Sequence, residues 1–246
     1  MIDTPSEQIG QLLPDDLRFF LSSRAPGNNL ATALSDTVTM GEQQLSQLVT
    51  TWLTDHEREC LDRFSFPKRR SEWLSGRICA KRAILDLLSG QSSRPLSPLD
   101  ISIEVGSSGR PSVVISERPR LFNDLDISIS HSQGKAIGIA GHGLCGVDIQ
   151  HLNDTLFRVK SRFCDEFEMA LLENVMESDL VQLGLLWVSK EAIRKCFSAL
   201  ALLGFLEIHL ERISVDRGYR LLSFYLVEPL SSIGTISVTT HLHGSY

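Results

Sequence analysis

The sequence is poor in positive charge and in long apolar runs. Its 24 Lys and Arg residues are outnumbered by 30 Asp and Glu residues, which gives a formal net charge of -6. Such a balance supplies no overall positive field, so we expect no nucleic-acid partner, and any anion site must be local. The longest apolar run, 199–206, is far shorter than the roughly 20 residues needed to cross a bilayer. We therefore expect no membrane partner either.

The sequence also shows neither a secretory signal nor paired cysteines. Residues 1–10 hold no apolar stretch of the kind that secretory signals carry, so we expect a cytoplasmic protein. The hydrophobic content of 42% is that of a globular chain. The cysteines are widely scattered and contain no CxxC pair, which excludes the usual zinc and thiol-exchange motifs: they are Cys60, Cys79, Cys145, Cys164 and Cys196.

What the sequence does contain is two successive sets of helices followed by strands. In the first set we expect a helix pair within 43–63, with Thr54 as an N-cap, and a helix over Pro67–Leu88. In the first forty residues only Leu17–Leu21 resembles a strand. The later strands of the first set are expected at 101–105, 112–115, 126–131 and 136–140, and a fifth strand is expected at 144–150, directly after the lobe boundary. The second set has helices at 165–175 and 182–197, then strands at 206–215, 219–227 and 235–241.

This order predicts an α+β fold of two pseudo-symmetric lobes in one chain, each with helices packed on a small antiparallel sheet. We place the lobes at 1–142 and 143–246, on either side of a Gly-rich loop. Asp216-Arg217-Gly218 suits a hairpin turn in the second lobe. The repeat is one of element order, because no residue-level similarity between the halves is visible.

Three cations break the pattern of the 67–88 helix. At about 100° per residue, Arg70, Arg77 and Lys81 fall within roughly 40° of one another, near the middle of the apolar sector. A single inward cation is best explained by snorkelling or by pairing with an acidic residue. All three together favour an anion site, because unpaired inward charges cost several kcal/mol each. Both interpretations remain open.

Oxygen-bearing side chains gather in two segments of the second half. In a strand over 144–150, Asp148 and Gln150 would lie on one face about 7 Å apart, within reach of one hard cation or on an ordinary exposed face. Glu191 and Lys195 are one helical turn apart, the spacing of a surface ion pair. The combination with nearby cations predicts a magnesium site, since Mg²⁺ usually binds one or two carboxylates plus substrate phosphates.

The segment around Ser132 invites a different interpretation. His131-Ser132-Gln133-Gly134 resembles part of a hydrolase nucleophile elbow, which requires Gly two residues before the serine and a helix after it. Here Ser130 replaces that glycine, and a strand is expected over 136–140. A serine hydrolase is therefore a distant alternative. His131 could contact a phosphate or play a structural part.

Five blocks together resemble the Sfp-type 4′-phosphopantetheinyl transferases. The family signature is G-[IV]-D-x-E followed by W-x-x-K-E-[AS]-x-x-K, which Gly146–Gln150 and Trp187–Lys195 resemble. The resemblance also includes the R-x-E-W-L-x-G-R segment in 70–81, the turn at Gly109-Arg110-Pro111 and the strand at Ser128–Ser132. All five blocks occur in the family's order, over about 53–203.

The resemblance implies an Mg²⁺-dependent enzyme that moves the 4′-phosphopantetheine arm of coenzyme A onto a serine of an apo acyl, peptidyl or aryl carrier protein. It implies release of adenosine 3′,5′-bisphosphate and a two-lobed α+β fold. We expect a monomer, because both lobes lie in one chain. Fatty-acid, polyketide, nonribosomal peptide and siderophore carriers all remain open.

The resemblance also implies roles for particular residues. Asp148, Gln150 and Glu191 would hold Mg²⁺, and Glu191 is our candidate for taking the serine proton. Lys190 and Lys195 would neutralise phosphate charge, and His131 would contact phosphate near the 3′ end of the nucleotide. The nucleotide pocket would be completed by Arg70, Arg77, Lys81, Arg110, Pro111 and Ser130.

The chain departs from the family at Gln150, where most bacterial members have an acidic residue. An amide oxygen can ligate a metal but brings no negative charge, so we expect weaker Mg²⁺ binding than a Gln150→Glu variant would show. The departure also keeps open a non-catalytic module that binds coenzyme A or a carrier protein. The central expectation is that Asp148 and Glu191 converge on one divalent ion.

Overall fold

The computed structural model describes residues 11–12, 30–36, 42–89, 94–106, 109–115, 124–175, 177–216 and 219–246. The chain divides into two compact units, Met1–Val147 and Asp148–Tyr246. The boundary follows Val147, where the sequence suggested one after residue 142. Each unit contains helices and antiparallel strands, which confirms the predicted α+β class.

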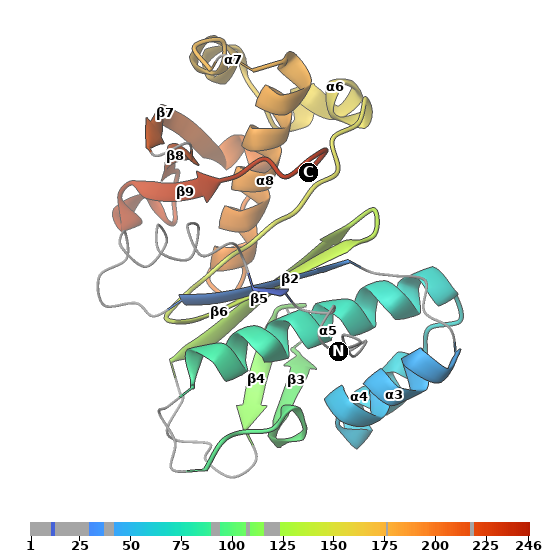
Figure 1. The fold of residues 1–246 in the computed structure, drawn as a ribbon. Coiled ribbons are helices and arrows are strands. Elements are labelled where there is room, and N and C mark those ends of the chain that lie inside the picture. Colours follow the sequence, from blue (N-terminus) through green and yellow to red (C-terminus); the bar gives the residue numbers. More distant parts are fainter. Residues whose placement is uncertain are drawn as a thin grey trace. The chain divides into compact units, whose positions relative to one another are not determined.

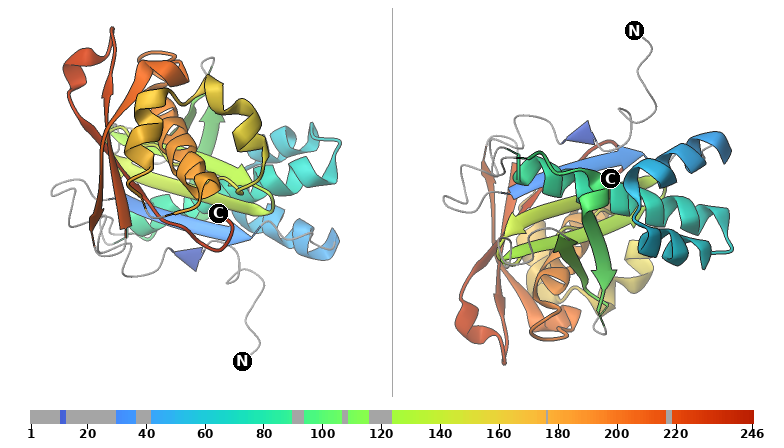
Figure 2. Two further views of the ribbon diagram at one scale, coloured as in Figure 1. Left: turned by 90° about the horizontal axis from the view of Figure 1, so that it is seen from above. Right: turned by 90° about the horizontal axis from the view of Figure 1, so that it is seen from below.

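The first unit is built on a four-stranded antiparallel sheet of order β1-β2-β6-β5. Its central strands run side by side in both views of Figure 2. A separate antiparallel pair is formed by β3 and β4. The strands are β1 (Gln11–Leu12), β2 (Leu30–Asp36), β3 (Ile101–Val105), β4 (Pro111–Ile115), β5 (Leu125–Ser132) and β6 (Lys135–His142).

Three helices complete the first unit: α3 (Glu42–Trp52), α4 (Asp55–Asp62) and α5 (Pro67–Leu87). The α4 helix begins where expected, because Thr54 and Glu57 form a reciprocal capping box. Pro67 opens α5 at a position where its missing N–H costs no helical bond. Helix α5 lies across β2, β6 and β5, and buried Ala and Ile side chains fill the layer between them (Figure 1).

The second unit packs its longest helix on a three-stranded antiparallel sheet of order β7-β8-β9. Leu and Phe side chains of α8 share one core with buried residues of β7 and β8. Asp165 opens α7 with a second capping box, closed by Glu168. The elements are α6 (Thr155–Val159), α7 (Glu166–Leu172), α8 (Asp179–Phe197), β7 (Ile208–Asp216), β8 (Tyr219–Leu226) and β9 (Ile236–Thr240).

One predicted strand is wrong. Residues 144–150 have no strand pairing and follow an irregular course. Their backbone donors find side chains instead of a neighbouring strand: Cys145 N–H donates to Asp126 Oδ2 at 2.8 Å, and Val147 N–H donates to Ser128 Oγ at 3.2 Å. The argument that Asp148 and Gln150 share a strand face therefore fails.

Two strands were missed, the two-residue β1 and the longer β2. Strand β2 pairs with β6 over its whole length, from Leu30 opposite Gly141 to Asp36 opposite Lys135. The sequence showed only loop signals there. The predicted strand Leu17–Leu21 and the turn residues 217–218 lie outside the described residues.

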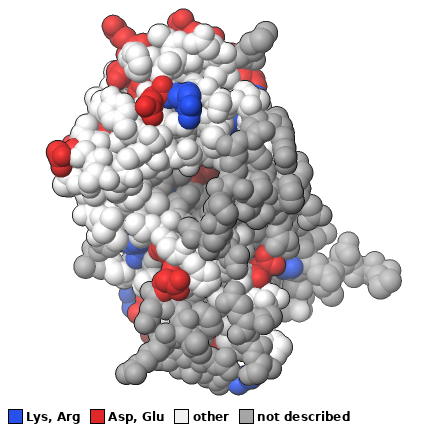
Figure 3. Space-filling model, turned by 90° about the vertical axis from the view of Figure 1, so that its left-hand side faces the viewer, with Lys and Arg blue, Asp and Glu red and all other residues white. Residues whose placement is uncertain are grey.

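The described part of the chain contains no helix that is both long enough and apolar enough to span a bilayer. On the face drawn in Figure 3, the described Lys and Arg side chains are scattered among acidic ones. That distribution agrees with the net charge of -6, which predicted no broad basic surface.

Candidate functional site

The carboxylates of Asp148 and Glu191 lie in one electrostatic cluster of the second unit. Helix α8 carries Glu191, Arg194 and Lys195 on consecutive turns. Lys195 Nζ donates to Asp148 Oδ1 at 2.6 Å, and Arg194 donates from a terminal nitrogen to Glu191 Oε1 at 3.1 Å. Lys195 therefore bonds Asp148, 47 residues away, as well as standing one turn from Glu191.

The negative charges of Asp148 and Glu191 repel each other. The pKa of Glu191 is raised, first by burial of its side chain and also by the negative charge of Asp148, while the cations of Arg194 and Lys195 oppose the shift. The side chain of Asp148 is only 8% exposed and that of Glu191 is 21% exposed, so solvent screens this repulsion incompletely. A divalent cation between them would relieve it.

Gln150 lies two residues after Asp148 in the same irregular segment. Its Nε2 donates to the carbonyl oxygen of His151 at 2.8 Å, which leaves the amide oxygen as the atom that could ligate a metal. Among the described residues no group of three or more His, Cys, Asp and Glu side chains could hold a metal. The two neighbouring carboxylates of Asp148 and Glu191 nevertheless suit Mg²⁺, which takes few protein ligands and completes its shell with phosphate oxygens and waters.

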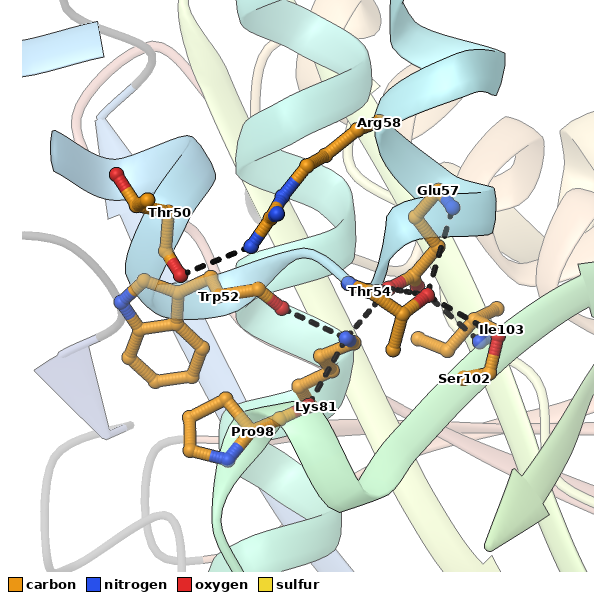
Figure 4. A network of polar contacts seen from close by, with 9 residues as sticks. All are labelled: Thr50, Trp52, Thr54, Glu57, Arg58, Lys81, Pro98, Ser102 and Ile103. Atoms are coloured by element: carbon orange, nitrogen blue, oxygen red, sulfur yellow. Dashed lines mark hydrogen bonds and ion pairs between the residues drawn. The ribbon is translucent and has the colours of Figure 1, made fainter. Parts of the chain in front are cut away.

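Lys81 is placed differently from the prediction. Its ammonium is fully buried and bonds Glu57 Oε2 at 2.5 Å, the carbonyl oxygen of Trp52 at 2.6 Å and that of Pro98 at 3.0 Å, as Figure 4 shows. Three acceptors use all three donors of an ammonium. For this inward cation, pairing with an acidic residue is therefore the explanation that fits.

Lys190 has the same kind of environment. Its side chain is 1% exposed, and Nζ donates to Glu168 Oε2 at 2.8 Å, to the carbonyl oxygen of Phe163 at 2.7 Å and to that of Phe205 at 3.1 Å. Burial lowers the pKa of Lys190 while Glu168 raises it. An ammonium with three protein acceptors has no donor left for a phosphate, so the phosphate role expected for Lys190 does not fit this geometry.

The two arginines of α5 that were predicted to line the pocket, Arg70 and Arg77, have different surroundings. Arg70 donates from its terminal nitrogens to the carbonyl oxygen of Leu61 at 3.1 Å and to Asp62 at 3.3 Å. Arg77 is 7% exposed and lies over the ring of Trp73, 4.6 Å from its centroid. Its Nε has no hydrogen-bond partner, and burial lowers its pKa. Of the inward cations, Arg77 alone keeps a buried donor without a partner, among the atoms described.

The remaining predicted pocket residues lie on β4, on β5 and in the turn that precedes β4. Arg110 bonds the carboxylate of Asp126 and the carbonyl oxygen of Cys145, and Pro111 opens β4. On β5, Ser130 is buried, and the more exposed His131 has Nδ1 3.8 Å from Glu72 Oε2. A network of Arg110 with Asp126 thus ties the turn before β4 to β5.

Ser132 ends β5 in a hairpin and is not followed by a helix. Gln133 and Gly134 both have positive φ, 43° and 92°, and β6 begins at Lys135. A nucleophile elbow needs a helix at this point. The geometry therefore gives no support to the hydrolase alternative.

Sequence reasoning missed three residues that shape the site: Glu57, Glu168 and Arg194. Arg194 bonds Glu191 and the carbonyl oxygen of Leu203, and its guanidinium lies 4.4 Å from the Phe205 ring centroid. The two glutamates close capping boxes with Thr54 and Asp165. The Thr-x-x-Glu and Asp-x-x-Glu spacings were visible in the sequence and could have identified them.

Comparisons with known proteins give structural likeness only. No protein-family model matches the sequence, and none of the curated proteins compared with it matches. The chain is similar to a holo-(acyl-carrier-protein) synthase from Bacillus anthracis str. Ames in complex with CoA (3′,5′-ADP), with 23% identity and a TM-score of 0.40. That similarity covers 46% of this chain and 93% of the other.

Two further solved structures give similar values. The holo-ACP-synthase from Plasmodium yoelii is 18% identical with a TM-score of 0.39, over 47% of this chain and 95% of that one. The holo-[acyl-carrier-protein] synthase from Helicobacter pylori in complex with coenzyme A is 22% identical with a TM-score of 0.31, over 45% and 96%. At these identities and TM-scores the likeness establishes neither the family nor the activity.

Proposed function

We propose that this protein is a 4′-phosphopantetheinyl transferase. It would transfer the 4′-phosphopantetheine group from coenzyme A to a serine of an apo carrier protein, with Mg²⁺, and release adenosine 3′,5′-bisphosphate. The observation that carries the proposal is the cluster in which Asp148 raises the pKa of Glu191 and Lys195 bonds Asp148. The five ordered sequence blocks support it independently.

The residues of this cluster have separate parts in the proposal. Asp148, Glu191 and the amide oxygen of Gln150 would hold Mg²⁺, which when bound would offset charge on the pyrophosphate oxygens. Lys195 orients Asp148 through its 2.6 Å bond and brings a second fixed positive charge. Glu191, or a water bonded to it, would take the serine proton.

The transfer itself is a substitution at phosphorus. The serine oxygen forms a bond to the phosphorus that carries the pantetheine arm, and the bond from that phosphorus to the bridging pyrophosphate oxygen breaks. Adenosine 3′,5′-bisphosphate leaves with that oxygen. Negative charge grows on the transferring oxygens, where fixed cations are most effective.

For the nucleotide we propose contacts from the first unit, with Arg77 as the strongest candidate. Its Nε is buried without a partner, a costly state that a bound phosphate would relieve. His131, at the more exposed end of β5, is proposed for the 3′-phosphate. The other proposed contacts are Arg70, Arg110, Pro111 and Ser130. Lys81 and Lys190 are left out, because protein acceptors use their donors.

The test is a mass measurement. The protein is incubated with coenzyme A, Mg²⁺ and a panel of apo acyl, peptidyl and aryl carrier proteins, and the carriers are weighed by mass spectrometry. We expect a metal-dependent, phosphopantetheine-sized gain on at least one carrier. Glu191→Gln should abolish it, whereas Glu59→Gln, which changes an exposed carboxylate of α4, should not.

Two outcomes would contradict the proposal. Binding of coenzyme A or carrier without any mass gain would indicate the non-catalytic module instead. Ester hydrolysis that Ser132→Ala abolishes would indicate a hydrolase. We include in the proposal that the protein is a cytoplasmic monomer, and light scattering behind size-exclusion chromatography tests the oligomeric state.

A further inference from the structure

The buried ammonium of Lys190 joins four elements of the second unit. Its three bonds reach Glu168 on α7, the carbonyl oxygen of Phe163 before α7, and that of Phe205 in the 3-10 turn before β7. The other oxygen of Glu168, Oε1, accepts from the N–H of Leu210 on β7 at 2.9 Å. One ion pair thus fixes α8 against the start of α7 and against β7.

The first unit contains the same arrangement. Lys81 on α5 bonds Glu57 of α4, and Glu57 Oε1 accepts from the N–H of Ile103 on β3 at 3.1 Å (Figure 4). The carbonyl acceptors correspond as well, since Trp52 precedes α4 and Pro98 opens the 3-10 turn before β3.

The positions match residue by residue. In each unit one carbonyl acceptor lies two residues before the helix N-cap, as Trp52 does before Thr54 and Phe163 before Asp165. In each unit the bonded strand amide lies five residues after the second carbonyl, as Ile103 does after Pro98 and Leu210 after Phe205. We call each set of bonds a lysine anchor, made by Lys81 and Glu57 in one unit and by Lys190 and Glu168 in the other.

The two anchors differ in the residue that follows the lysine. In the first unit the residue after the lysine is Arg82, and in the second it is Glu191. An anchor that recurs without a neighbouring carboxylate is a device for holding a long helix in place. In the second unit the same set of bonds also holds the helical turn that carries Glu191, and Lys195 one turn after it, in position relative to Asp148.

We propose that Lys190 and Glu168 are positioning residues that hold the Glu191 carboxylate beside Asp148 for metal binding. This inference rests on the proposed function, because it concerns the metal site of that function. Groups that orient metal ligands without touching the metal typically change its affinity by about 10–100-fold when they are mutated. We expect loss of the second anchor to have an effect of that size.

The test compares matched variants of the two anchors. Glu168→Gln and Glu57→Gln each leave a buried ammonium facing a neutral amide of similar shape. Binding of Mn²⁺, which prefers the same oxygen ligands as Mg²⁺, is followed by electron paramagnetic resonance with coenzyme A present and no carrier protein. Urea unfolding is measured on the same samples.

We expect both variants to lose similar stability. Only Glu168→Gln should weaken Mn²⁺ binding, by about tenfold or more, in conditions where circular dichroism shows both variants to be folded. If Glu168→Gln does not fold, Lys190→Met is measured in its place. Equal Mn²⁺ affinity in Glu168→Gln and the natural protein, or an equal loss in Glu57→Gln, would overturn the positioning role.

The same titration distinguishes the two proposals. A natural protein that binds Mn²⁺ and modifies carriers, but whose affinity is insensitive to the second anchor, retains the proposed function and loses this inference. A natural protein that neither binds Mn²⁺ nor modifies any carrier loses both.

Discussion

A close approach between the backbones of β6 and α5 predicts a large effect of one methyl group. Gly138 lies in β6 beneath α5, and a Cβ atom there would stand 2.5 Å from Ala80 N, 2.7 Å from Cys79 C and 2.8 Å from Ala80 Cα. Comfortable contacts between such atoms are about 3.5–4.0 Å. All three obstacles are helix backbone, so Gly138→Ala must push α5 away from the sheet by about 1 Å.

The cost follows from that displacement. Alanine alone would favour a strand over glycine by about 0.5–1 kcal/mol. Overpacking a close-packed interior costs about 1–3 kcal/mol, and a rigid backbone obstacle places this site at the upper end. We expect a net loss of about 2 kcal/mol in the free energy of unfolding, or roughly 4–8 °C in the thermal midpoint of a unit of this size.

Gly184→Ala is the matched control. On α8 the new Cβ would clash with Leu152 Cδ2, at 2.2 Å, and that atom is the end of a flexible side chain, while the other nearby atoms lie at ordinary contact distances of 3.7 and 3.9 Å. A new rotamer removes this contact, and alanine gains about 1 kcal/mol of helix propensity. Tryptophan fluorescence in urea, from Trp52 and Trp73 in one unit and Trp187 in the other, reports both variants. Unfolding of Gly138→Ala within about 0.5 kcal/mol of the natural protein would refute the reasoning.

Three further predictions concern charge and reactivity. Glu191→Gln should raise the thermal midpoint at pH 8, because the pKa of Glu191 is raised in the folded state and the ionised side chain lowers stability at pH values above that pKa. The gain should shrink as pH falls from the raised pKa to the ordinary value of 4.5, and it should be absent below that value. A gain that persists unchanged at pH 3 would contradict this. Gln150→Glu should lower the Mg²⁺ concentration that half-saturates transfer, and an equal or higher value would remove the idea. Iodoacetamide at pH 8 should modify the half-buried Cys60 and Cys196 before Cys79 and Cys164, because burial raises the pKa of Cys79 to about 12 and of Cys164 to about 11; early labelling of Cys79, read by peptide mass spectrometry, would contradict it.

The fold was predictable where local signals mark the elements. Strand β3 has the bounds that its flanking residues predicted, and Pro67 and Thr54 mark the starts of α5 and α4. Strand β2 was not predictable in this way, since its partner β6 lies about a hundred residues later, as the Asp36–Lys135 ion pair shows with a separation of 99 residues. No pattern within 30–36 reveals such a partner.

The strand predicted over 144–150 failed for a related reason. Its alternation of apolar and polar residues is real, but a strand also needs a neighbour to accept its backbone bonds. Asp126 and Ser128 accept the N–H groups of Cys145 and Val147 instead. Asp148 lies near Glu191 on an irregular segment, so its singling out rested on an argument about the wrong element.

The roles of the inward lysines were hidden because their partners are distant side chains and backbone atoms. A helical wheel places Lys81 inside but does not distinguish a bound phosphate from Glu57, 24 residues earlier. The phosphate role of Lys190 came from the family resemblance, which does not reveal its bond to Glu168, 22 residues earlier. For Arg77 no such partner exists at Nε, among the atoms described, which is why it stays a candidate for the nucleotide.

The same physics explains why the two halves looked unrelated in sequence. Of the groups in each lysine anchor, only the lysine and the glutamate are side chains; the other partners are carbonyl and amide groups, which any residue supplies. The N-cap residues also differ, with Thr54 in one unit and Asp165 in the other, because a hydroxyl oxygen and a carboxylate oxygen can both cap a helix. Because most of the repeated bonds involve the backbone, the only trace of them in the sequence is a capping box and a lysine 22–24 residues after the capping-box glutamate. Searching for that spacing, and not for residue identity, would have found it.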